Sequence, residues 1–130
     1  MATVQELSGK AYDESDEVMH AYRVILDHLR GSMFLISDGA VPSNKDQGYF
    51  TRRLIRRAIR FAHKLGIEGN FCGSIIQSYI DIYKQAYPEL ADKQAVILES
   101  VKNEEAKFQK TLVNGLREFE KLTNQAAITG

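Results

Sequence analysis

Apolar residues recur at steps of three and four along most of this chain, and this spacing constrains its fold more than any other feature. Such steps return to one face of an α-helix, whereas a β-strand alternates at every second residue. Strand-like alternation is absent, and the only two prolines, Pro42 and Pro88, lie where the pattern breaks. The chain is therefore predicted to be all-α, and its 130 residues suit one domain.

Several helix boundaries are marked by local signals. Ser15 is expected to cap the first helix, and Gly39 suits a left-handed position just after its end. Gly115, inside the last helix, is interpreted as a point of close helix contact. Because the loops are short, we predict an antiparallel bundle of about four to five helices with a long C-terminal helix, about 45 Å in length. The expected helices cover residues 16–37, 48–65, 70–85 and 92–122.

Residues 1–14 lack a clear pattern and are interpreted as a disordered end of a single domain spanning residues 1–130. No apolar run approaches the roughly 20 residues that a membrane span needs, and the N-terminus lacks a secretory signal pattern. The single cysteine, Cys72, cannot form an internal disulfide and is interpreted as a small buried apolar residue. These features predict a cytoplasmic protein without a membrane partner.

The net charge is zero, but the charges are unevenly distributed. Residues 1–29 contain six acidic and two basic residues, which gives a net charge of −4. Residues 30–66 contain two acidic and eight basic residues (+6), and residues 67–130 contain nine acidic and seven basic residues (−2). A local excess of this kind is typical of a surface that binds an anionic partner. A solvated face with acidic neighbours across the fold explains the same excess, and from charge alone it is the better explanation.

The helix expected at residues 48–65 carries apolar residues on one side and basic residues on the other. At 100° per residue, the basic side chains fall within an arc of roughly 140°. Planar guanidinium groups match phosphate oxygens, so a one-sided row of them suits a nucleic-acid backbone. The row consists of Arg52, Arg53, Arg56, Arg57 and Arg60.

Ser43 and Asn44 precede this helix. A helix N-terminus offers free backbone N–H groups and the positive end of the dipole, which both suit phosphate. An exposed asparagine has a donor and an acceptor, so it can read a base edge. Tyr49 is interpreted as partly buried at the helix start, with stacking on a sugar or base as the alternative. The segment is therefore predicted to combine one base reader with a row of phosphate-binding arginines.

The sequence contains no recognisable catalytic or metal-ligand pattern. His20, His28 and His63 lack the spacing that places two ligands on one helical face. The glycines do not form a phosphate-binding loop motif. Asp27 and Arg30, three residues apart, are predicted to form an ion pair rather than a catalytic pair. We therefore expect no catalytic residue, metal site or cofactor in this chain.

Three runs, in this order, resemble the alanyl-tRNA synthetases. They are residues 22–30 (YRVILDHLR), 34–44 (FLISDGAVPSN) and 48–58 (GYFTRRLIRRA), with a further likeness at residues 104–116. In that family the runs belong to a helical domain that follows the class II catalytic domain of a ligase, which joins alanine to its tRNA with ATP and magnesium. The resemblance implies a tRNA-recognition fragment of a larger enzyme, with tRNA and the catalytic and editing domains of the same chain as partners.

The resemblance also implies roles for single residues. The family reads a G·U wobble pair of the acceptor stem with the asparagine of its Pro-Ser-Asn motif, which corresponds to Asn44, with Ser43 beside it. Gln47, after Asp46, stands where the family often has an arginine, and the chain ends at Gly130, before a segment with a second reader, an aspartate. We therefore expect weak binding with reduced discrimination. As a group, the arginines that support the acceptor stem are Arg52, Arg53, Arg56, Arg57 and Arg60.

Two other functions fit the same residues. One is a stand-alone, non-enzymatic helical RNA-binding protein, which a reading frame ending near Gly130 would indicate. The other is a structural or protein-interaction module, in which the arginines pair with acidic residues of this chain or of a partner. Burial of residues 52–60 in intramolecular ion pairs would favour the module.

Overall fold

A computed structural model describes the backbone of residues 15–67 and 69–129, and the side chains of these residues up to residue 115. This part of the chain contains helices, loops and turns but no strand, so the predicted all-α bundle with a long C-terminal helix is confirmed. The disordered end predicted at residues 1–14 lies outside the described residues. The helices are α2 (Asp16–Ser37), α3 (Asp46–Lys64), α4 (Cys72–Tyr83), α5 (Glu89–Asp92) and α6 (Gln94–Thr129).

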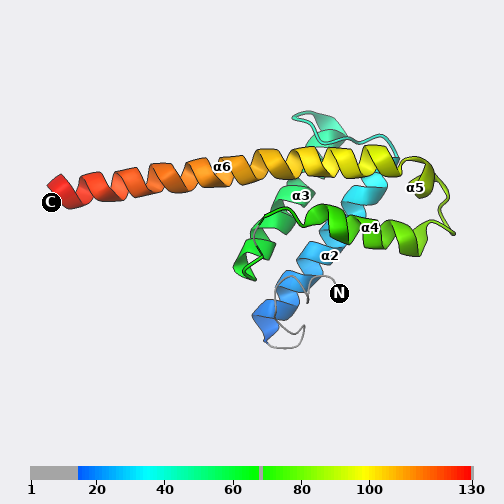
Figure 1. The fold of residues 1–130 in the computed structure, drawn as a ribbon, viewed down its shortest axis with the longest axis horizontal. Helices are drawn as coiled ribbons and strands as arrows, with labels where there is room; N and C mark the ends of the chain where they lie inside the picture. The colour runs from blue at the N-terminus through cyan, green and yellow to red at the C-terminus, as the bar shows by residue number, and fades with distance from the viewer. Residues whose placement is uncertain (1–14, 68, 130) are drawn as a thin grey trace.

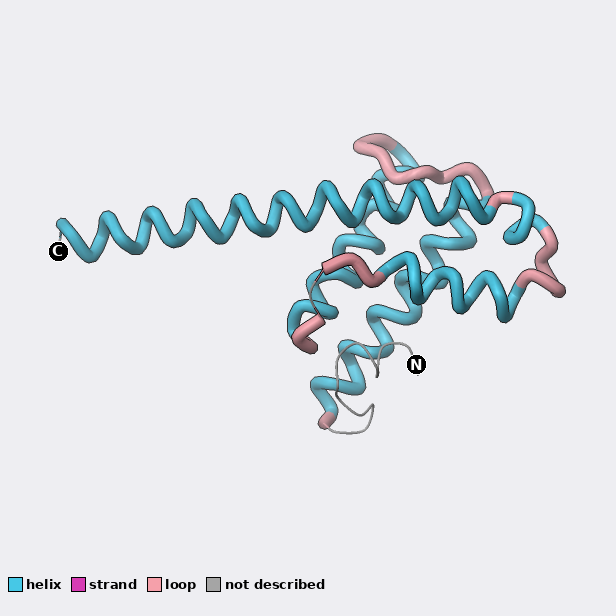
Figure 2. The backbone as a smooth tube through the Cα atoms, viewed as in Figure 1, coloured by secondary structure: helices cyan, strands magenta, loops and turns pink. Residues whose placement is uncertain are grey.

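The helices form two antiparallel pairs that cross each other (Figure 1). α3 returns along α2 after a short loop, and α4 lies beside the first half of α6. α6 also contacts α2 and α3 where it crosses them. Figure 2 shows the second half of α6 extending beyond the other helices. With its 36 residues, α6 is about 54 Å long, which exceeds the predicted length.

The core lies where the two pairs cross. α2, α3, α4 and α6 each turn one apolar face into it, and no single helix could bury such a face alone. Removal of this apolar surface from water is the main favourable contribution to folding. The buried side chains include Tyr22, Ile25, Leu29, Met33, Ile55, Ile59, Ile75, Ile76, Ile80, Ile97, Val101 and Phe108.

Both ends of α2 follow the local signals in the sequence. The hydroxyl oxygen of Ser15 accepts a hydrogen bond from the backbone N–H of Val18 at 3.2 Å, as expected for an N-cap. Gly39 has φ of +104°, and the N–H of Ala40 donates to the carbonyl of Leu35 at 2.8 Å. Glycine is favoured here because it adopts positive φ without a steric penalty.

α3 begins at Asp46, two residues earlier than predicted. Asp46 has φ of +52°, in the left-handed region that aspartate tolerates better than most residues. Gly48 is buried, and a Cβ atom added to it would stand 2.2 Å from Oγ of Ser43 and 2.5 Å from the carbonyl oxygen of Val41. The N–H of Ser43 donates to the carbonyl of Gly48 at 3.1 Å. The missing side chain at position 48 therefore allows the loop 41–45 to fold against the first turn of α3.

The N-terminus of α4 is capped by a residue of α6. Glu105 is 1% exposed, and its Oε2 accepts hydrogen bonds from the backbone N–H groups of Phe71 and Cys72 at 3.0 and 3.1 Å. A carboxylate at this position also interacts favourably with the helix dipole. α4 begins at Cys72, two residues after the predicted start, where the N–H groups bonded to Glu105 lie. Cys72 itself is buried, as predicted.

The long helix expected at residues 92–122 is α6, which begins at Gln94 and ends at Thr129, and the short α5 precedes it. Lys93 lies between the two helices, and its ammonium group donates a hydrogen bond to the carbonyl oxygen of Ser37 at the end of α2. Gly115 was interpreted as a point of close helix contact, and this is wrong. A Cβ atom at Gly115 would meet no heavy atom within 4 Å among the described residues, so no other helix approaches it closely there.

Candidate nucleic-acid interface

A groove of about 770 Å³ is formed along α3. All five arginines predicted from the sequence line it, and Lys64 adds a sixth positive charge. His28 of α2 and the aromatic residues Tyr49, Phe50 and Phe61 also line it. Tyr49 and Phe50 are 49% and 53% exposed, respectively. The groove therefore combines concentrated positive charge with accessible aromatic rings.

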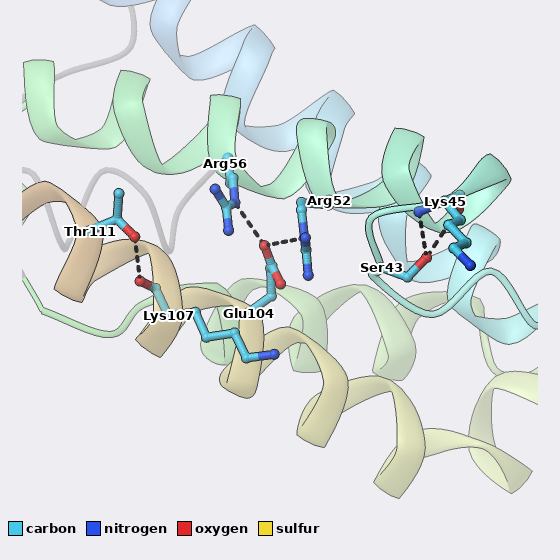
Figure 3. A network of polar contacts seen from close by, with 7 residues as sticks. All are labelled: Ser43, Lys45, Arg52, Arg56, Glu104, Lys107 and Thr111. Carbon is cyan, nitrogen blue, oxygen red and sulfur yellow. Dashed lines mark hydrogen bonds and ion pairs between the residues drawn. The ribbon is translucent and has the colours of Figure 1, made fainter.

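Two of the arginines are held by Glu104 of α6 (Figure 3). Glu104 is 2% exposed, and its Oε1 accepts a hydrogen bond from Nε of Arg56 at 2.8 Å. The same oxygen lies 3.0 Å from Nε of Arg52, in an ion pair without hydrogen-bond alignment. The Arg52 and Arg56 side chains are 21% and 30% exposed. They lie at the edge of the basic arc, where α6 packs across α3, and are partly removed from solvent.

Phe108 lies one turn further along α6 and contacts arginines of the same row. The guanidinium carbon of Arg56 is 5.0 Å from the centre of its ring, and that of Arg60 is 5.5 Å from it. These distances are within the range of a cation–π interaction. Arg56 is therefore contacted by both a carboxylate and an aromatic ring, whereas Arg60 is exposed and contacts the ring.

Arg53 and Arg57 are exposed on the other side of the row, and neither forms an ion pair with another residue among those described. Arg53 lies 5.9 Å from the ring centre of Tyr49, and Arg57 lies 5.6 Å from that of Phe61. A ring contact leaves the N–H groups at the guanidinium edge available to oxygen acceptors. These two arginines are thus open to an anionic ligand.

Among the described residues, the arginines of the row divide into two that pair with an acidic residue and three that do not, and this division bears on the alternative of a structural module. Glu104 pairs with Arg52 and Arg56, whereas Arg53, Arg57 and Arg60 remain exposed. The row of arginines is therefore not mostly buried in intramolecular ion pairs. A purely structural role accounts for Arg52 and Arg56, and leaves the other three arginines unexplained.

The structure places Ser43 and Asn44 in the loop before α3. Asn44 is exposed, so its amide group is accessible to a ligand. The Ser43 hydroxyl donates to the carbonyl of Lys45 at 3.0 Å and accepts from its N–H at 3.3 Å (Figure 3). The Ser43 side chain therefore closes the loop that carries Asn44. Lys45 makes no side-chain cap to α3, so its own side chain leaves the first-turn N–H groups uncovered.

His28 is half-buried at the edge of the groove, and two effects lower its pKa. Burial makes the larger contribution and the positive charge of Arg57 the second, while Asp27 opposes them. Both effects favour the neutral form of the imidazole. Asp27 itself forms the predicted ion pair with Arg30, at 3.2 Å.

Sequence reasoning missed His28, which lines the groove, and Glu104 and Phe108, which contact its arginines from α6. Glu104 and Phe108 are four residues apart and therefore share one helical face, but the sequence does not show which helix that face meets. Tyr49, expected to be partly buried at the helix start, is 49% exposed, so about half of its surface is covered and the rest is accessible beside Arg53. The alternative interpretation, stacking on a sugar or base, is sterically open.

Among the residues that the structure describes, no three His, Cys, Asp or Glu side chains are grouped so that they could hold a metal ion. Within the same part of the chain, no helix combines the length and the apolar character needed to cross a membrane.

Comparison with known proteins agrees with the resemblance seen in the sequence. A sequence model of the family "tRNA synthetases class II (A)" matches residues 1–129. The alanine–tRNA ligase of Herpetosiphon aurantiacus is 45% identical over 95% of this chain, and that of Borreliella afzelii is 42% identical over 92%. The alanine–tRNA ligase of Staphylococcus aureus (strain JH9) is 40% identical over 99% of the chain.

These matches cover only part of each relative. The chain spans 14% of the Herpetosiphon ligase, 20% of the Borreliella ligase and 15% of the Staphylococcus ligase. The family match, in contrast, covers almost the whole of this chain. The chain belongs to the class II (A) tRNA synthetase family, and the relatives to which it is similar are alanine–tRNA ligases.

Proposed function

We propose that this chain binds the acceptor stem of alanine tRNA, as the tRNA-recognition part of an alanine–tRNA ligase. A catalytic domain elsewhere in the longer protein would join alanine to the tRNA with ATP and magnesium, in the cytoplasm, alongside an editing domain. In this proposal ATP and magnesium act at that catalytic domain, and this chain supplies no part of their site. Its contribution would be to bind and orient the tRNA.

The observation that carries this proposal is the position of an exposed asparagine directly before an exposed row of arginines. Asn44 lies in the loop before α3, and Arg53, Arg57 and Arg60 are exposed on the helix itself. Arg53 and Arg57 are one turn apart, about 6 Å along the helix axis. This spacing suits contacts to successive phosphates of one strand. Such contacts would fix the position of the stem and leave the choice of base pair to Asn44.

The chemistry of a G·U wobble pair suits an asparagine reader. The wobble geometry leaves the exocyclic amino group of guanine without a partner base, and it projects into the minor groove. In A-form RNA this groove is wide and shallow, so a side chain can reach it. The Asn44 side-chain oxygen would accept a hydrogen bond from that amino group. In a G·C pair the amino group is already hydrogen-bonded to cytosine.

Titration of the chain with two RNA hairpins would test the proposal. One hairpin carries the G·U pair of the alanine acceptor stem, and the other carries G·C in its place. With three to four phosphate contacts, the slope of log affinity against log salt is expected to be about −3, so a fourfold rise in salt weakens binding roughly 60-fold. Absence of salt-dependent binding to both hairpins would overturn the proposal in favour of the protein-interaction module.

Asn44→Ala should remove the preference for the G·U hairpin, because the acceptor for the guanine amino group is lost. The salt slope should stay the same, because no phosphate contact changes. Asn70→Ala is the matched control, since Asn70 is also exposed but does not line the groove. A preference that survives Asn44→Ala would contradict the assigned reader.

Arg53→Ala and Arg57→Ala should weaken binding to both hairpins alike. Each substitution should reduce the salt slope by about 1, because one phosphate contact is lost. Lys102→Ala is the control for charge, since Lys102 is exposed on α6 outside the groove. An equal effect of Lys102→Ala would mean that the net charge, and not the groove, determines the affinity.

A further inference from the structure

We infer that Glu104 is a positioning residue of the RNA-binding groove. It holds Arg52 and Arg56 in place, so that removal of its negative charge weakens RNA binding although the groove becomes more positive. This inference rests on the proposed function and extends it to a residue of a different helix, 48 positions from Arg56 along the chain.

The carboxylate of Glu104 offsets a repulsion within the arginine row. Arg52, Arg56 and Arg60 follow one another at four-residue steps, where like charges on a helix repel each other. A buried carboxylate is costly unless it is paired, and Glu104 is paired with both Arg52 and Arg56. The charge of Glu104 therefore offsets the repulsion between Arg52 and Arg56 and holds both side chains in one arrangement. This arrangement is already present without RNA.

The contacts with Glu104 leave the terminal guanidinium nitrogens of Arg52 and Arg56 able to donate to a ligand. Glu104 contacts Nε of Arg52 and of Arg56, and both residues also line the groove. Because a guanidinium has five N–H donors, the terminal nitrogens keep donors for phosphate oxygens. The ring of Phe108, 5.0 Å from the Arg56 guanidinium, restricts the same side chain from a second direction. Arg56 therefore faces the groove with few alternative rotamers.

Preordering improves affinity because flexible side chains lose rotamer freedom when they bind. Two arginine side chains that are freed must lose this rotamer freedom on binding, so RNA binding should become about tenfold weaker. Removal of one negative charge acts in the opposite direction, by about twofold for a phosphate assumed to lie about 10 Å away in water. The net expectation for Glu104→Gln is binding about fivefold weaker.

The first experiment compares two substitutions that remove the same charge from the same helix. Glu104→Gln and Glu99→Gln are titrated with the G·U hairpin, and Glu99 is exposed on α6. We expect about fivefold weaker binding for Glu104→Gln and unchanged or up to about twofold tighter binding for Glu99→Gln. Equal or tighter binding by a folded Glu104→Gln variant would overturn the inference.

The second experiment observes the held side chain directly, without RNA. The Nε–H of Arg56, which donates to Glu104, should exchange with water more slowly than that of Arg53 in an NMR measurement. Glu104→Gln should accelerate this exchange, and Glu99→Gln should not. If thermal unfolding shows that the Gln variant is not folded, Glu104→Asp, which keeps the charge on a shorter side chain, is expected to change the exchange in the same direction.

A double-mutant cycle links the two observations. Arg56→Lys keeps the charge but lacks the Nε–H that Glu104 accepts. It should weaken RNA binding in the unsubstituted chain and have a smaller effect in the Glu104→Gln background. Additive effects would overturn the inference while leaving the proposed function intact. No RNA binding by the unsubstituted chain would overturn both, whatever the exchange rate at Arg56.

Discussion

Gly48 and Ser43 approach each other so closely that a Cβ atom at position 48 would stand 2.2 Å from the Ser43 hydroxyl oxygen. Gly48→Ala should therefore force the loop that carries Asn44 away from α3. The preference of Gly48→Ala for the G·U hairpin over the G·C hairpin should fall toward the preference shown by Asn44→Ala, because Asn44 is displaced. Unfolding in urea should show a loss of about 1–3 kcal/mol, the usual cost of overpacking.

Gly115→Ala is the matched control for this prediction. A Cβ atom at Gly115 would meet nothing within 4 Å, and the residue lies inside α6. Alanine is therefore expected to stabilise the chain by roughly 0.5–1 kcal/mol through helix propensity, without any effect on RNA discrimination. If Gly48→Ala behaves like Gly115→Ala, the close approach to Ser43 does not control the loop.

Glu105→Ala should destabilise the fold, because it leaves the N–H groups of Phe71 and Cys72 buried without an acceptor. The expected loss is about 2–4 kcal/mol in the free energy of unfolding, measured with urea. Glu105→Gln keeps an acceptor oxygen and should cost less. Glu99→Ala, at an exposed position of the same helix, should change stability by no more than about 0.5 kcal/mol.

His28 should make stability depend on pH. Its pKa is lowered in the folded chain by burial and by Arg57, so the unfolded chain binds a proton at a higher pH than the folded chain does. The free energy of unfolding should therefore be fully maintained above the ordinary histidine pKa of about 6.5 and fall as the pH decreases toward the folded value. Urea unfolding at several pH values measures this dependence.

Two variants locate the effect. His28→Gln should flatten the dependence, whereas His63→Gln, at an exposed position, should preserve it. A bound phosphate beside Arg57 would offset the arginine charge and raise the pKa of His28, which an NMR titration with and without the hairpin would detect. An unchanged His28 titration in the presence of bound RNA would place the phosphates elsewhere.

Cys72 should be almost inert toward thiol reagents in the folded chain. Burial raises its pKa well above the ordinary value, and the charge of Glu105 raises it further, so little of the reactive thiolate is present. The rate of reaction with a disulfide reagent should increase in proportion to the unfolded fraction as urea is added. Rapid reaction without urea would mean that the start of α4 opens locally.

Features set by neighbouring residues could be predicted from the sequence. α2 has the predicted bounds because Ser15, Gly39 and the spacing of the apolar residues all act within a few positions of the helix. The separation of apolar from basic residues around α3 was predicted for the same reason, since it depends only on the helical repeat.

Features set by distant residues could not be predicted. The ion pairs of Glu104 span 48 positions in the case of Arg56, and the cap from Glu105 to Phe71 spans 34. Helical spacing identifies the residues that share a face, but the angle at which two helices cross decides which faces meet. The division of the arginines into held and exposed groups follows from that crossing.

α6 is one continuous helix from Gln94 to Thr129, so a tilt at its packed end displaces its other end. Glu104 and Phe108 fix its near arm against α3, while the far arm extends about 37 Å from Glu104 to Thr129. A tilt of about 10° at the crossing would move the far end by about 6 Å. If α6 tilts as one body, the far arm moves together with the Glu104 and Phe108 side chains that contact Arg52, Arg56 and Arg60.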